Sequence, residues 1–251
     1  MPKVALGGSS RERQSRWSGL HRPGSWRAGL AVLVSLAVAI GSPAWGQSRP
    51  RPSAPAPPPY MGFSPDDEQI SQRTMNKYAG CLLRTFRKRA LAFLRLPPAS
   101  YEAMLAARKL ATGWCLREGA LSFRFQLLRG GLYEALYEEQ FERAGAAGLT
   151  AVPPVDYSGG NPTPLSDETA FAIALVQFAD CVVRANPTAS RALILSKVTS
   201  DEEKAAFASL TPHLGGCLVS GTQLKFSRPM LRGFVAEALY RLSAATVART
   251  K

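Results

Sequence analysis

The feature that most constrains the fold of this chain is a sequence that occurs twice, each time after a pair of cysteines. LRGGLYEALY at 128–137 returns as LRGFVAEALY at 231–240, with seven identities in ten positions. Upstream, YAGCLLR at 78–84 matches FADCVVR at 178–184, and GWCLREG at 113–119 matches GGCLVSG at 215–221. Matches that keep the same order over about 65 residues indicate an internal duplication.

The first 46 residues have the pattern of a bacterial export signal. A basic stretch with Arg22 and Arg27 precedes an apolar run of 11 residues at 30–40, and the small residues Ala44 and Gly46 follow. Such a run is shorter than the roughly 18 to 20 residues that span a bilayer. We therefore expect a signal peptide at 1–46, cleavage after Gly46, a periplasmic or secreted protein, and no transmembrane anchor after cleavage.

The four cysteines are expected to form disulfides, because an even number in an exported chain usually does so. The duplication favours the pairs Cys81 with Cys115 and Cys181 with Cys217, each inside its own repeat. A metal site is disfavoured, since no Cys-x-x-Cys occurs and His213 is the single histidine after residue 46. We expect no metal and no cofactor.

Composition divides the rest of the chain into segments. QSRPRPSAPAPPPYMG is rich in proline and too poor in large apolar side chains to fold, so it is predicted to be a disordered spacer. A second segment rich in proline and glycine separates the two copies and is predicted to be a linker. The predicted order is spacer 47–62, helical repeat 63–145, linker 146–165, helical repeat 166–245 and C-terminal tail 246–251.

Each repeat is predicted to contain three helices. Proline-containing breaks separate the first two helices of each copy, at Pro97–Pro98 and Asn186–Pro187. Helix-start signals occur in both copies, at Ser64 with Pro65, Pro98 to Ser100, Ser166, Ser200 with Glu203, and Ser227 with Pro229. The third helix of the first copy is placed at 126–143. The predicted fold is therefore all-α, a tandem duplication of a three-helix unit with one disulfide in each unit.

The repeated decamer has two sides when it is placed on a helix at about 100° per residue. One is an apolar core stripe, and the other carries a glycine, a glutamate and a tyrosine in both copies: Gly130, Glu134, Tyr137, Gly233, Glu237 and Tyr240. Packing explains these residues, because glycine lets another helix approach and the polar groups find partners. The two helices are then expected to meet about a pseudo-twofold axis. A ligand groove lined by both copies is the alternative.

No catalytic motif occurs after residue 46: there is no nucleophile elbow, phosphate-binding loop, zinc-protease helix or dinucleotide fingerprint. Glu134 and Glu237 form the one candidate catalytic pair, by analogy with the paired carboxylates of glycosidases. Whether the chain is an enzyme stays uncertain, and a noncatalytic role is favoured. The alternative is an enzyme with a cleft between the two repeats that uses these two glutamates.

The formal net charge is +13, and removal of residues 1–46 leaves 25 basic and 17 acidic side chains, a net charge of +8. Part of the excess lies in one run that the second copy lacks: Arg84, Arg87, Lys88, Arg89 and Arg95. We expect this run to bind an anionic envelope component or another envelope protein. Nucleic acid is not expected, because no aromatic residues of the stacking kind accompany the arginines. The predicted function is therefore an exported noncatalytic helical repeat protein that binds or organises a cell-envelope partner.

Overall fold

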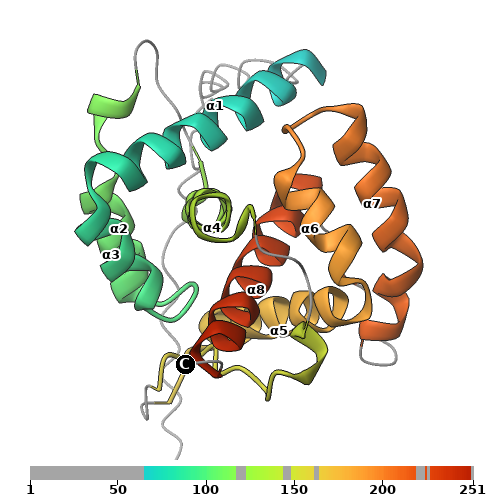
Figure 1. Ribbon diagram of the computed structural model, residues 1–251. Helices are drawn as coiled ribbons and strands as arrows, with labels where there is room; N and C mark the ends of the chain where they lie inside the picture. The colour runs from blue at the N-terminus through green and yellow to red at the C-terminus, as the bar shows by residue number, and fades with distance from the viewer. Residues whose placement is uncertain are drawn as a thin grey trace, which may run out of the picture. The chain divides into compact units, whose positions relative to one another are not determined.

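α-Helices joined by loops and single turns of 3₁₀ helix make up the described part of the chain (Figure 1). The computed structural model describes residues 65–116, 123–143, 148–160, 164–218, 224 and 227–249, with side chains from residue 69 onward. All of them belong to one unit, residues 58–251. These residues contain no β-strand, which confirms the all-α class. The predicted signal and spacer, 1–46 and 47–62, lie outside the described residues.

Eight helices follow one another in the described residues, four before the linker and four after it. The first four are α1 Pro65–Thr85, α2 Arg87–Arg95, α3 Tyr101–Leu110 and α4 Phe125–Phe141. The last four are α5 Asp167–Ala185, α6 Pro187–Leu195, α7 Asp201–Leu214 and α8 Arg228–Arg249. Because α8 ends at Arg249, residues 246–249 of the predicted tail are helical.

The expectation of three helices on each side of the linker is wrong, because α2 and α6 are separate elements. Each has nine residues and follows a long helix after a single non-helical residue. At α6 the break follows from the sequence, since Asn186 accepts a hydrogen bond from the Ala189 amide and Pro187 takes the first helical position. At α2 the break lies at Phe86, which has φ −121° and ψ 39° and makes no side-chain cap.

Serine residues begin three further helices, as the sequence predicts. The hydroxyls of Ser100, Ser166 and Ser200 accept hydrogen bonds from backbone amides in the first turns of α3, α5 and α7. The residues before two of these caps, Ala99 and Thr199, have positive φ angles of 59° and 66°. The connections α2–α3 and α6–α7 therefore share the same unusual backbone conformation immediately before the serine cap.

Both predicted disulfides are present, and each joins a long helix to a 3₁₀ turn. Cys81 in α1 bonds Cys115, and Cys181 in α5 bonds Cys217, with Cα–Cα distances of 5.8 and 5.7 Å. The closed loops span 34 and 36 residues. Each bridge thus fixes the end of the shorter helices α3 and α7 to the long helix of its own half.

Helices α4 and α8 pack against each other at the centre of the described unit (Figure 1). Helix α1 covers α4 and helix α5 covers α8, while the pairs α2–α3 and α6–α7 lie on opposite sides of this centre. The apolar stripe of α4 is buried at Leu128, Leu132 and Leu136. Most of α8 from Leu231 to Leu239 is also buried, on every side of the helix, as expected of a central helix.

The described part of the linker, 148–160, packs on α5 and α8 through the buried side chains of Leu149, Val152 and Tyr157. Arg184 of α5 donates hydrogen bonds to the carbonyls of Leu149 and Val152, and the Tyr157 hydroxyl donates to Asp180 at 2.6 Å. The linker is therefore held against the second half by directed polar contacts. No helix of the described ranges has the length and apolar character that crossing a bilayer requires.

Candidate functional site

The helices α4 and α8 approach each other most closely at two glycines of the repeated decamer. A Cβ atom built on Gly130 would lie 2.5 Å from the Cα of Gly233, and one built on Gly233 would lie 3.1 Å from the Cα of Gly130. No larger residue fits this crossing without moving a backbone. Gly130 and Gly233, each predicted to share a side of its own helix with a glutamate and a tyrosine, therefore face each other across the centre of the unit.

Glu237 is held by two guanidinium groups. Arg129 donates from Nε and Nη2 to its two carboxylate oxygens, both at 2.7 Å, and Arg241 donates from Nη2 at 3.0 Å. Arg129 also donates to the carbonyls of Leu94 and Leu96 at the end of α2. With two arginines and one glutamate, this cluster has one surplus positive charge.

Glu134 belongs to a second cluster with the opposite surplus. Its Oε2 accepts from Arg232 Nε at 2.9 Å and from the Asn76 amide at 3.0 Å, and Arg232 Nη1 donates to Glu203 at 2.8 Å. With its three remaining N–H groups, Arg232 donates hydrogen bonds to the Ser196 hydroxyl and to the carbonyls of Ile194 and Ser196. All five donors of this guanidinium are thus satisfied within the protein.

The two glutamates have opposite pKa shifts. Burial raises the pKa of Glu134, and the single guanidinium of Arg232, which Glu203 shares, does not fully offset the burial. Burial acts on Glu237 in the same direction, but the guanidinium groups of Arg129 and Arg241 outweigh it and hold the pKa of Glu237 below its usual value. Glu134 and Glu237 occupy the same position of the repeated decamer, yet their pKa values are shifted in opposite directions.

The two predicted tyrosines lie apart from these ion pairs. Tyr137 is fully buried and packs against Phe141, with ring centroids 5.6 Å apart. Tyr240 is partly exposed, contacts the rings of Tyr133 and Phe141, and donates to Gln140. The structure therefore places Gly130, Glu134, Gly233 and Glu237 along the α4–α8 interface, with the tyrosines in an aromatic cluster at one end of it.

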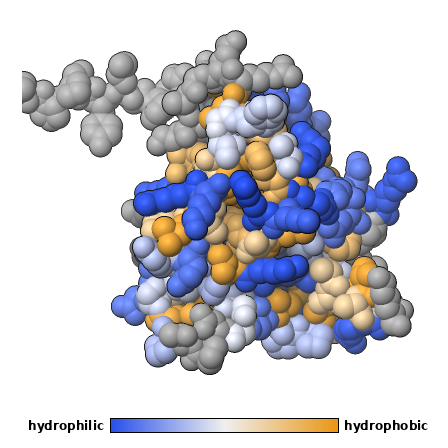
Figure 2. Space-filling view, turned by 90° about the vertical axis from the view of Figure 1, so that its left-hand side faces the viewer, coloured by the Kyte–Doolittle hydropathy of each residue, from blue (hydrophilic) through white to orange (hydrophobic). Residues whose placement is uncertain are grey.

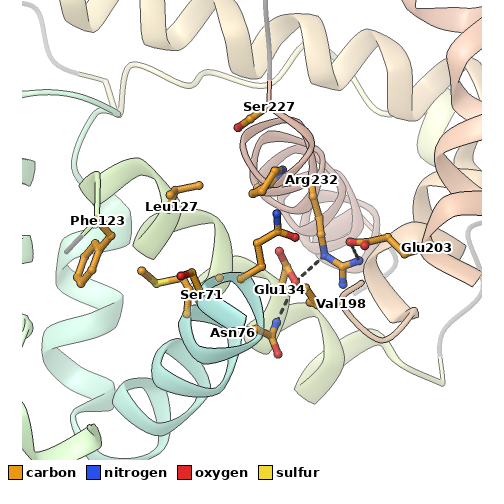
Figure 3. Close-up of a pocket in the computed structure, with 14 residues that line it drawn as sticks. Ser71, Asn76, Phe123, Leu127, Glu134, Val198, Glu203, Ser227 and Arg232 are labelled. Carbon is orange, nitrogen blue, oxygen red and sulfur yellow. Dashed lines mark hydrogen bonds and ion pairs between the residues drawn. The ribbon is translucent and has the colours of Figure 1, made fainter. Parts of the chain in front are cut away.

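A pocket of about 230 Å³ opens between α1, α4, α8 and the start of α7 (Figure 3). Its walls are mainly apolar and include Met75, Phe123 and Leu127. Glu134, Arg232, Glu203 and Asn76 also line it, and Figure 3 shows their hydrogen bonds and ion pairs on one side of the space. Of the residues predicted for a ligand groove, Glu134 and Gly233 line this pocket.

The five basic residues of the predicted anionic-partner site are all exposed but do not belong to one helix. Arg84 lies in α1 and the others in α2, so the break at Phe86 divides the run between two helices. Arg87 pairs with Glu139 of α4 at 2.7 Å, and Arg89 lies over the Phe86 ring. Helix α3 adds exposed Arg108 and Lys109, which the sequence reasoning did not include.

Charge is distributed unequally between the helix pairs on the two sides of the unit. Helices α2 and α3 carry six basic side chains and one acidic, a net charge of +5. Helices α6 and α7 carry two basic and three acidic, a net charge of −1. Tyr101 and Trp114, next to the two ends of α3, are 66% and 79% exposed. Figure 2 shows this side of the unit, with long hydrophilic side chains lying across an apolar surface.

No protein-family model, curated protein or solved structure matches this chain. The candidate site therefore rests on geometry alone. Sequence reasoning missed Asn76, which donates to Glu134, and Glu203, which shares Arg232 with Glu134. Both differ from the other half, which has Val176 and Ala103 at the corresponding positions. That difference between the copies was the available signal.

Proposed function

We propose that this chain is an exported, noncatalytic helical protein that binds an anionic component of the cell envelope through the surface of α2 and α3. The signal-like pattern at 1–46 supports export, and so do the two disulfides, which persist in oxidising compartments. The contrast in charge between α2–α3 and α6–α7 carries the binding proposal. Because packing requires helices on both sides but not a positive charge on one of them, a surplus of positive charge confined to α2 and α3 is better explained by an anionic binding partner.

Exposed aromatic side chains beside this charge favour a lipid surface as the anionic component. Tyr101 and Trp114 offer rings with a polar group, a combination suited to the boundary between lipid headgroups and acyl chains. Lys88, Arg89 and Arg95 of α2 are exposed nearby in the same helix pair. Basic residues close to an anionic membrane contribute about 1 kcal/mol each.

We further propose that the unit is a tandem duplication with a pseudo-twofold axis between α4 and α8. Four features in matching order support it: the succession of four helices in each half, the cysteine pairs, the positive φ angles of Ala99 and Thr199, and the glycine crossing. The exchanged ion pairs support it as well. Arg129 binds Glu237 and Arg232 binds Glu134, so each copy supplies the counter-ion of the other.

The same contacts favour binding over the catalytic alternative, in which Glu134 and Glu237 act together in a cleft. A catalytic pair needs both carboxylates beside bound substrate, as in glycosidases. Here they are 5% and 2% exposed, and each is bound to an arginine of the other half. A packing role accounts for both groups.

Co-sedimentation with lipid vesicles tests the function. The purified protein is expected to bind vesicles that contain an anionic phospholipid, to bind zwitterionic vesicles weakly, and to lose binding as salt rises. Replacing Lys88, Arg89 and Arg95 by Gln is expected to weaken binding about 100-fold, from about 1 kcal/mol for each charge.

The matched control replaces three basic residues of the other half, Lys197, Lys204 and Arg249, by Gln. It removes the same net charge from exposed positions and is expected to change vesicle binding little. Equal losses in the two triple variants would mean that overall charge, and not the α2–α3 surface, drives binding. Binding that is unaffected by salt would contradict the proposal directly.

A further inference from the structure

The pocket between α1, α4, α7 and α8 offers hydrogen-bond acceptors to a ligand, and its arginine offers no free donor. Arg232 makes five hydrogen bonds to protein acceptors, one for each N–H. Glu134 and Glu203 are carboxylates, which accept but do not donate when ionised. A ligand group that contacts Glu134 or Glu203 must therefore be a donor.

The charge of the cluster points to a cation. Two carboxylates share one guanidinium, which leaves one negative charge in a site with apolar walls. A negative charge of this kind attracts a positive ligand group more strongly where water is partly excluded. An anionic group there would meet both carboxylates, and Arg232 has no N–H left to receive it.

The pocket features belong to one half only. Gly131 lines the pocket, whereas the second decamer has Phe234, which is buried, at the corresponding position. Helix α1 presents the Asn76 amide, whereas α5 has the buried Val176. The counterpart cluster carries the surplus positive charge of Arg129 and Arg241. Packing alone would give both halves the same residues, so the space and its negative charge need a separate explanation.

We propose that this pocket binds a small organic cation with an apolar body, whose ammonium or guanidinium group lies against Glu134 while its apolar part contacts Met75 and Leu127. An adjoining hollow, lined in part by Lys204 and Arg228, shares Glu203 and Ser227 with the pocket. These two cations disfavour a positive group at that side, which directs the ligand's charged end toward Glu134. The site lies apart from the α2–α3 surface and is independent of the function proposed above.

Three probes of equal chain length test the pocket: n-hexylammonium, 1-hexanol and hexanoate, titrated into the isotopically labelled protein and followed by amide chemical shifts. We expect n-hexylammonium to bind most tightly, hexanol more weakly and hexanoate least. The shifted amides are expected in α1, α4 and α8 around the pocket. Hexanoate binding as well as the ammonium, shifts confined to other surfaces, or no binding by any probe would each overturn the proposal.

Two variants sharpen the test. Glu134→Gln keeps the shape of the side chain and removes its charge, so n-hexylammonium is expected to bind about 30-fold more weakly while hexanol is unaffected. Ser71→Phe places a large ring at an exposed position of the lining and is expected to reduce binding of both probes. Glu237→Gln, the same change in the other cluster, serves as the matched control. If it weakens the ammonium as much as Glu134→Gln does, the assignment is wrong.

Discussion

Two glutamates at the same position of a repeated decamer have different surroundings in this protein. Glu237 receives three hydrogen bonds from Arg129 and Arg241, whereas Glu134 shares Arg232 with Glu203. A buried charge is stabilised only where its partners compensate for lost hydration. The same substitution should therefore have unequal consequences at the two positions.

Glu237→Gln is expected to destabilise the protein more than Glu134→Gln. Removing Glu237 leaves the buried guanidinium of Arg129 and the partly buried one of Arg241 without their counter-charge, which costs about 3–5 kcal/mol. After Glu134→Gln, Arg232 still pairs with Glu203, and a loss of about 1–3 kcal/mol is expected. Denaturant unfolding at pH 7 measures both values. A larger loss for Glu134→Gln would show that the number of arginines bound to each glutamate does not determine its contribution to stability.

The stability difference between wild type and Glu237→Gln is expected to depend on pH. Because the folded protein holds the pKa of Glu237 below its unfolded value of 4.5, the stabilisation is complete above that pH and is lost as pH falls below it. For Glu134, whose pKa is raised, wild type gains relative to Glu134→Gln as pH falls toward 4.5. As pH falls, the stability of wild type relative to Glu237→Gln should therefore decrease, whereas its stability relative to Glu134→Gln should increase. Unfolding free energies of the three proteins at several pH values measure both differences.

Gly130→Ala is expected to cost about 1–3 kcal/mol or more, since its methyl group would overlap the Gly233 backbone and force α4 and α8 apart. Gly216→Ala is the control, because a Cβ atom there meets nothing within 4 Å. Thermal unfolding of the two variants gives the comparison. Equal melting temperatures would mean that the close crossing is not required.

At the level of elements, the sequence predicted helix starts better than helix number. Ser166, Ser200 and Pro98 to Ser100 carry recognisable start signals, and the helices begin there. Helix α2 has no such signal, since its break falls at Phe86 within a continuous helical pattern, and nine residues are too few to show a separate periodicity. Helix α2 packs against α1 and α3, and contacts of this kind cannot be read from local sequence.

The two disulfides are expected to contribute equally to stability. Their loops of 34 and 36 residues give nearly the same loss of unfolded-state entropy, about 4 kcal/mol each in the chain-entropy model. Replacing Cys81 and Cys115 by Ala, or Cys181 and Cys217 by Ala, should therefore lower the unfolding free energy by similar amounts. A large inequality would show that one bridge acts on the folded state.

At the scale of the whole described unit, the candidate pocket could not be predicted from sequence. Its lining comes from four helices, and the partner of each polar group depends on how those helices pack. Helical spacing correctly put Gly130 and Glu134 on one side of α4, yet it contains no information about the opposing helix. The exchange of partners between halves became visible only in the assembled fold.

The unit from α1 to α8 is expected to unfold in a single transition, because the α4–α8 interface contains the ion pairs of both halves. Hydrogen exchange read by mass spectrometry at rising denaturant should show α1–α4 and α5–α8 opening together. Opening of one half at a distinctly lower denaturant concentration would contradict this expectation.

The exchanged ion pairs also make the centre of the unit dependent on the last helix of the chain. A truncated chain that ends before α8 contains Arg129 and Glu134 but lacks Glu237 and Arg232. Helix α4 then lacks the counter-ions for its two buried charges, and burying them unpaired is costly. We therefore expect a chain truncated before α8 not to form the central layer and to be readily cleaved by proteases.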